Sequence, residues 1–216
     1  MSYVITSDYE LNRIVAPRLP AATVEYDQNY INQLNNILRL YFNQIDNILG
    51  QLSASTLITS IRVPYIAVSD SVSHTVTANT ANAMTFDTVD YSNSCSLVST
   101  SQLTVTYAGI YNLQFSTQFQ NTDTQLHDVS VWLRKNGTDI VGSTGLISIP
   151  NKHGGVDGHT ISGWNFFVSL AANDYIQLYW STTNAAITIQ AYAAGVSPTR
   201  PTTASNVATL TFVSAL

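Results

Sequence analysis

The sequence predicts an all-β antiparallel domain at the C-terminus, preceded by one α-helix and an extended N-terminal arm. Three observations indicate this order. Apolar residues first follow no period, then recur at intervals of three and four residues, and then alternate with polar residues at every second position. The expected boundaries are an arm over 1–25, a helix over 26–53 and the β domain over 54–216. A chain of 216 residues suits one β domain of ordinary size with a modest extension.

The composition is poor in charge and excludes several classes of function. Charged residues make up 10% of the chain and hydrophobic residues 45%, because Ser, Thr, Asn and Gln replace the usual Lys and Glu. A net charge of −5 with only eight Lys plus Arg offers no basic surface for phosphates, so we expect no nucleic-acid partner. The sequence has neither a signal-peptide h-region nor a run of about 18 apolar residues, so we expect no membrane partner and synthesis in a host cytoplasm.

The first 25 residues are expected to form an anchoring arm. They mix charges, tyrosines and two prolines without a sustained period, and segments of this kind become ordered when they dock on a partner. The residues expected to make the anchoring contacts are Tyr3, Val4, Ile5, Tyr9, Leu11, Ile14, Val15, Leu19 and Pro20.

The helix is predicted by an uninterrupted heptad spacing, which is typical of a coiled coil. Asp27 lies where an N-cap carboxylate would meet the positive end of the helix. Ile37, Phe42 and Leu49 widen the apolar stripe, and a wide stripe favours three helices over two. The alternative is an amphipathic helix that lies on its own domain or on a neighbour. The residues of the expected oligomer seam are Ile31, Leu34, Leu38, Tyr41, Ile45, Ile48 and Leu52.

The β domain is predicted by alternation with a period of two. From Tyr111 to Phe119, apolar residues alternate with Asn, Gln and Ser, so one face of the strand is apolar and the other is polar. Similar runs are separated by turn signals such as Asn136-Gly137, which suits a type I′ hairpin. Eight or so short strands without an intervening helix indicate a sandwich or a barrel. Cys95 is the only cysteine, so no intrachain disulfide forms, and we expect a buried thiol.

Several segments of this domain resemble the jelly roll shared by complement globular heads and tumour-necrosis-factor-like ligands. Residues 101–111, SQLTVTYAGIY, are similar to its strand-turn-strand, and residues 129–137 are similar to the hairpin that follows. Residues 167–178 resemble a later hairpin, with Asn173 in place of the usual glycine. The resemblance covers roughly residues 63–216. It implies a jelly-roll head in a tight homotrimer, with aromatic residues on the three-fold axis.

The N-terminal third carries a second resemblance. Residues 19–27, 30–34 and 40–46 are similar to a segment that opens structural proteins of podophages infecting cyanobacteria and other aquatic bacteria. In that setting the segment implies a module that attaches different C-terminal domains to the virion. Receptor-binding tail fibres are often much longer than this chain, which favours a short head fibre or a capsid decoration (cement) protein.

No catalytic motif accompanies the four histidines, and we expect a protein that is not an enzyme. The β domain contains no Glu, so a glycosidase with paired carboxylates is the weakest candidate. Two loops carry side chains that could bind a metal ion, but we favour ordinary polar loops and expect neither a metal nor a cofactor. The candidate ligands are His153, Asp157 and His159 in one loop, and Asn121, Asp123, His127 and Asp128 in the other.

Three aromatic residues, Trp132, Tyr179 and Tyr192, lie out of phase with the expected inward faces. They either fill a trimer axis or line a glycan-binding groove. The expected function is that of a homotrimeric structural protein of a phage virion, held on capsid or tail proteins by its arm. One alternative is a receptor-binding tail fibre or tail-attached spike that recognises a host surface glycan. Another, with less support, is a secreted complement-like or cytokine-like ligand.

Overall fold

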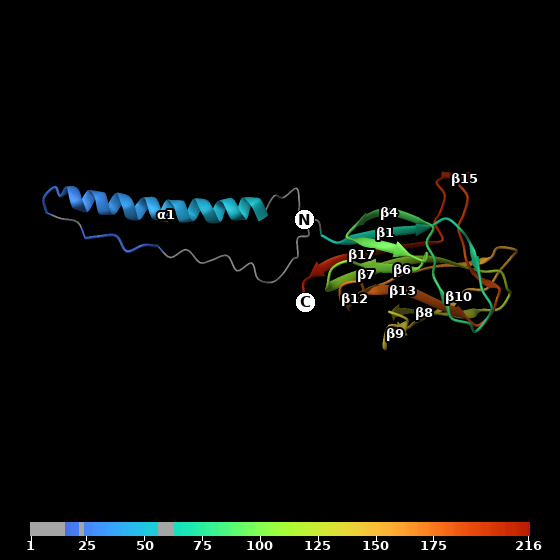
Figure 1. Ribbon diagram of the computed structural model, residues 1–216. Helices are drawn as coiled ribbons and strands as arrows, with labels where there is room; N and C mark the ends of the chain where they lie inside the picture. The colour runs from blue at the N-terminus through green and yellow to red at the C-terminus, as the bar shows by residue number, and fades with distance from the viewer. Residues whose placement is uncertain (1–15, 22–23, 56–62) are drawn as a thin grey trace. The chain divides into compact units, whose positions relative to one another are not determined.

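The computed structural model describes residues 16–21, 24–55 and 63–216, and within 50–55 it describes the backbone alone. The chain divides into two compact units, Met1–Arg62 and Val63–Leu216. The first unit contains the helix α1 (Gln28–Ser55), and the second contains the strands (Figure 1). No helix in the described parts of the chain is both long enough and apolar enough to cross a membrane.

Helix α1 begins where Asp27 caps it, as the sequence predicts. The Asp27 carboxylate accepts the N–H of Asn29 at 2.8 Å, and the Asp27 carbonyl accepts the N–H of Ile31 at 3.2 Å. The helix then continues to Ser55, so it starts and ends later than the predicted span of 26–53. Ala54 and Ser55, where we expected the β domain to begin, are helical, because Ala favours a helix and Ser disfavours one too weakly to end it.

The second unit consists of short antiparallel strands that form two main sheets and one small hairpin sheet. The strands are β1 Tyr65–Asp70, β2 His74–Thr75, β3 Asn82–Ala83, β4 Thr88–Asn93, β5 Cys95–Val98, β6 Gln102–Val105, β7 Gly109–Asn121, β8 His127–Lys135, β9 Thr138–Asp139, β10 Gly145–Ile149, β11 Gly158–Ser162, β12 Asn165–Leu170, β13 Tyr175–Thr182, β14 Ile187–Ile189, β15 Gly195–Val196, β16 Thr199–Arg200 and β17 Asn206–Ser214.

The order of these strands is that of a jelly roll. The first sheet runs β2-β14-β7-β17-β1-β4, with β11 and β12 also paired to β7. The second sheet runs β10-β8-β13-β6-β5, with β3 and β9 attached to β13 and β8. Among the eight principal strands (β1, β6, β7, β8, β10, β12, β13 and β17), the chain changes sheet at every step except from β8 to β10. This pattern of interlocked Greek keys confirms the predicted all-β antiparallel head.

The core lies between the inner faces of the two sheets, and β7 shows how the sequence places it. Leu113, Phe115, Thr117 and Phe119 are buried, while the residues that alternate with them remain partly or fully exposed, so the predicted alternation is confirmed. Across the core, β13 contributes Trp180, whose ring centroid lies 5.7 Å from that of Phe119. The Tyr111 hydroxyl donates a hydrogen bond to the Tyr107 carbonyl at 2.8 Å, so this large buried ring has a partner for its polar atom.

Two turns adopt left-handed backbone conformations. Asn136 and Gly137 have φ angles of 48° and 81°, as a type I′ turn requires, and they connect β8 to β9. The predicted hairpin is therefore confirmed. Asn173 has a φ angle of 66°, which asparagine tolerates better than other residues with a side chain. Glycine adopts this conformation readily as well, so it would suit the same position.

Candidate functional site

The apolar seam of α1 is a candidate contact surface in the described part of the first unit. Within the described part of the chain, none of the seam residues from Ile31 to Ile48 is buried, and each remains partly exposed. The neighbouring residues Leu40, Phe42 and Leu49 are 60%, 57% and 54% exposed. An apolar stripe of this width is stable in water when another surface covers it. Leu52 belongs to the helix, but its side chain lies outside the described residues.

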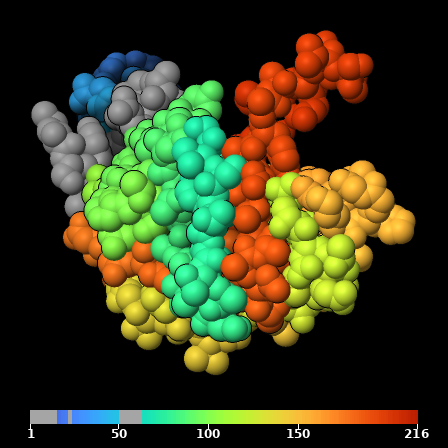
Figure 2. All heavy atoms as spheres, turned by 90° about the vertical axis from the view of Figure 1, so that its right-hand side faces the viewer, coloured from blue at the N-terminus to red at the C-terminus, as the bar shows by residue number. Residues whose placement is uncertain are grey.

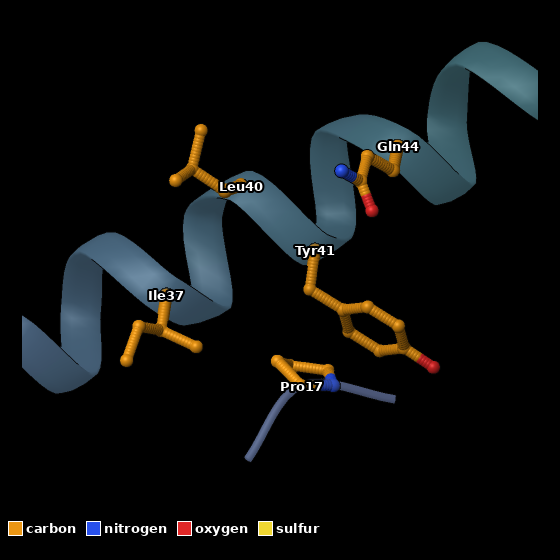
Figure 3. A pocket seen from close by; sticks show the side chains of 5 residues that line it. All are labelled: Pro17, Ile37, Leu40, Tyr41 and Gln44. Atoms are coloured by element: carbon orange, nitrogen blue, oxygen red, sulfur yellow. The ribbon is translucent and has the colours of Figure 1, made fainter. Parts of the chain in front are cut away.

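One described segment of the arm contacts this helix. Pro17 lines a pocket together with Ile37, Leu40, Tyr41 and Gln44. Figure 3 shows the Pro17 ring beside Ile37 and the aromatic ring of Tyr41. Tyr41 is a predicted seam residue and Ile37 flanks the seam. The described part of the arm therefore covers one edge of the apolar stripe, while Phe42 and Leu49 on the other edge are exposed.

Only two of the predicted anchoring residues lie in the described part of the chain. Leu19 is 50% exposed, and Pro20 is partly buried. The others, Tyr3, Val4, Ile5, Tyr9, Leu11, Ile14 and Val15, lie outside the described residues. Their role as an anchor stays a prediction.

Trp132 and Tyr179 form a cluster on the outer face of the second sheet. They are cross-strand partners, and their ring centroids are 5.9 Å apart. The guanidinium of Arg134 lies 3.8 Å from the centroid of the Tyr179 ring. Asp139 accepts hydrogen bonds from the Trp132 indole at 2.8 Å and from Arg134 Nε at 2.7 Å. Arg134 covers a face of Tyr179 on which a sugar ring would stack, and Asp139 already accepts the hydrogen bonds of Trp132 and Arg134. This cluster is therefore poorly suited to bind a glycan.

Tyr192 lies beside β11 of the first sheet, so the three predicted aromatic residues do not share one surface. Its hydroxyl is 3.0 Å from Nδ1 of His159, and the two rings meet edge to face at 5.8 Å. Burial and, to a smaller degree, the negative charge of Asp157 raise the pKa of the Tyr192 hydroxyl. Tyr192 precedes the β15–β16 hairpin, which projects in red from the end of the head that Figure 2 shows.

The loop over 153–159 does not gather its candidate ligands. His153 and Val156 exchange two backbone hydrogen bonds of 2.9 Å around a tight turn. The Asp157 carboxylate pairs with Lys152 at 2.8 Å and accepts a hydrogen bond from Gln120 at 2.7 Å. His159 meets Tyr192 instead. The side chains of Asp157 and His159 therefore each have a different partner from the same chain.

The candidate ligands in the loop over 121–128 also have hydrogen-bond partners within the chain. The Asp123 carboxylate is 2.7 Å from Nε2 of His127, and the Asn121 side-chain oxygen accepts the N–H of Asp123 at 2.9 Å. Asp128 accepts a hydrogen bond from the Ser148 hydroxyl at 2.6 Å. Among the residues that the structure describes, no three His, Cys, Asp or Glu side chains are grouped so that they could hold a metal ion.

Cys95 is buried in the core, as the sequence predicts. Burial raises the pKa of its thiol to about 12. The thiol is therefore protonated at neutral pH and acts as a small apolar side chain, because the thiolate is the reactive form of cysteine.

Several aspartates of the head are stabilised in their charged form, which predicts loss of stability in acid. A hydrogen bond from Lys135 holds the pKa of Asp174 below its ordinary value of 3.8, and hydrogen bonds from His127 and Arg134 do the same for Asp123 and Asp139. The unfolded chain therefore binds more protons near pH 4, so this stability is present above that pH and is lost as the pH falls through the lowered pKa values. We expect the unfolding temperature to drop between about pH 5 and pH 3.

Asp174→Asn should flatten this pH dependence while lowering the unfolding temperature at pH 7, because the variant loses the ion pair with Lys135 at 2.9 Å. Thermal unfolding of the full chain, followed at both pH values and at one protein concentration, checks this. A variant with the same drop as the wild type would show that Asp174 does not contribute.

No protein-family model matches this chain, and no curated protein matches it in sequence. Among solved structures, the globular domain of the zebrafish complement 1qA protein is similar to it. The match covers 71% of this chain and 99% of that chain, at 12% sequence identity and a TM-score of 0.44. The chain therefore has a complement globular domain as a distant structural neighbour. The strand order of the head, and not this likeness, establishes the jelly roll.

Proposed function

We propose that the chain is a homotrimeric structural protein of a phage virion that displays jelly-roll heads on a short helical rod. The observation that carries this proposal is the apolar seam of α1, whose described residues remain partly exposed. Three parallel copies of the helix would bury residues such as Leu38 and Ile45 against one another. Apolar residues at Ile37, Phe42 and Leu49 broaden the stripe enough to suit three helices.

The surface of the head supports a role in close assembly. From Asn112 to Gln120 of β7, the positions that face outward are occupied by amides and hydroxyls, such as Gln114, Ser116 and Gln118, and not by charged residues. Burying charge between protein copies is costly, whereas amides and hydroxyls find hydrogen-bond partners across an interface. The low charge of the whole chain, 10%, is consistent with such packing.

Attachment to the virion is supported by the resemblance of the N-terminal third to podophage structural proteins. A trimer presents three arms to a capsid lattice at once. Modest affinity of a single arm then becomes stable attachment, because the second and third arms bind at high effective concentration. A short head fibre or decoration (cement) protein on the capsid surface would use the arm in this way.

Electron microscopy of purified particles tests the proposal. A tag added at the C-terminus should appear at many symmetric positions on the capsid of the phage that encodes the chain. A variant without residues 1–15 keeps Pro17 and α1, so it should still form a trimer but should be missing from particles. Incorporation of this variant at the wild-type level would contradict attachment by the arm.

A receptor-binding tail fibre is the second candidate, and the Tyr192–His159 pair favours it. A partly exposed aromatic ring beside the hydrogen-bonding groups of His159, Asp157 and Lys152 is the kind of surface that holds a sugar. Tyr192→Ala should then abolish binding to host cells or to their surface polysaccharide. Trp132→Ala is the matched control and should leave binding unchanged. Tags found at the tail tip would favour this function over capsid decoration.

A further inference from the structure

The contact between Pro17 and α1 is placed at the edge of the helix where a second copy would pack. If the seam residues are numbered as coiled-coil positions, Leu38 is an a residue and Tyr41 is a d residue. Ile37 and Gln44, which line the pocket with Pro17, are then g residues. The arm therefore lies on the g side of the seam.

The opposite side of the seam carries exposed apolar residues. Phe42 and Leu49 are e residues in the same numbering, and they are 57% and 54% exposed. Positions e and g lie on opposite flanks of one helix, so Phe42 points away from the Pro17 pocket of its own chain. In a parallel coiled coil, each g residue faces the e residue of the neighbouring helix five positions further on. Ile37 would therefore face Phe42 of the next copy, and Gln44 would face its Leu49.

We infer that Pro17 is clasped between its own α1 and Phe42 of a second copy of this chain. The inference rests on the proposed trimer and names the surface that completes it. Pro17 already occupies the g side, and the e side of the next helix offers an apolar ring without a described cover. Proline suits this place because its fixed φ angle favours an extended segment and because it has no N–H that burial would leave unpaired.

The clasp explains why the flanks of the seam carry no charged residues. Pairs of Glu and Lys commonly join e and g positions of neighbouring helices, but these positions in α1 hold Asn35, Ile37, Phe42, Gln44, Leu49 and Gln51. An arm that lies between the helices needs apolar or neutral neighbours, because a charge beneath it would be desolvated. If Pro17 packs between two copies of α1, it belongs to the helical rod and not to the virion anchor. Attachment to the virion would then depend on residues further towards the N-terminus.

Disulfide trapping in the full chain tests the clasp. The variant Pro17→Cys with Phe42→Cys should give covalent trimers on a non-reducing gel after mild oxidation, because each arm is linked to the next helix. The variant Pro17→Cys with Leu40→Cys should form its disulfide within one chain and migrate as a single chain. The control is Pro17→Cys with Asn43→Cys, since position 43 is exposed and lies on the far face of the helix. The Phe42 variant should crosslink between chains several-fold more than this control.

Light scattering before oxidation separates failure of the clasp from failure of the trimer. A mass of three chains together with crosslinking through Phe42 supports the clasp. A mass of three chains in which only the Leu40 variant forms a disulfide overturns the clasp and leaves the trimer standing. A mass of one chain overturns both, and it would mean that the arm covers the seam of its own helix. The single variant Pro17→Cys shows whether the buried native Cys95 takes part.

Discussion

Replacing Leu38 and Ile45 together with aspartate is expected to convert the proposed trimer into single chains and to unfold α1. The two substitutions would place six carboxylates in the seam of the trimer, and an unpaired charge in an apolar interior costs several kcal/mol. Most of the stability of an amphipathic helix comes from packing of its apolar face, so the helical circular dichroism signal should fall as the chains separate. Light scattering at micromolar concentration would show the mass drop from three chains to one chain of 23.5 kDa.

The matched control carries the same added charge on the opposite face of the helix. Asn36 and Asn43 are exposed and lie outside the seam, so Asn36→Asp with Asn43→Asp should keep both the mass and the helical signal. The head should unfold at a similar temperature in both variants, because its core is separate from α1. If the seam variant retains the mass of three chains, α1 is not the contact that holds the trimer together.

The elements that the sequence predicted correctly are those set by local patterns. The heptad spacing placed α1, and the alternation from Tyr111 to Phe119 placed the inner face of β7, because side-chain direction follows from the period of the backbone. The start of α1 was predictable from Asp27. Its end was not, because Ser53 and Ser55 carry only a weak preference against a helix.

The order of the strands could not be derived from periodicity. β17 pairs with both β7 and β1, which are far from it along the chain, and no local pattern records such a pairing. The jelly roll was expected only because three hairpins, including the one with Asn173, resemble those of known heads. Asn173 adopts a left-handed conformation, which glycine also adopts readily.

The candidate site was predicted in part, and the missing contacts are long-range ones. The alternation along the strands correctly placed Trp132 and Tyr179 on an outer face. It did not predict that Arg134 lies over the Tyr179 ring, because that contact depends on the register between β8 and β13. The sequence did not predict the contact of Pro17 with α1, because the apolar residues of the arm follow no regular period. Tyr192 meets His159 across 33 positions of the sequence.

Trp180→Ala is expected to destabilise the head by about 3–5 kcal/mol, because it leaves a large cavity between the two sheets. Trp180 is 1% exposed and packs against Phe119, whereas Trp132 is partly exposed on the outer face. Trp132→Ala removes the same side chain from a site with less burial, so we expect a loss of about 1 kcal/mol. Thermal unfolding at one protein concentration should therefore show a drop several-fold larger for Trp180→Ala. Equal losses would contradict the assignment of inner and outer faces, because the two tryptophans lie on paired neighbouring strands and differ chiefly in the face they occupy.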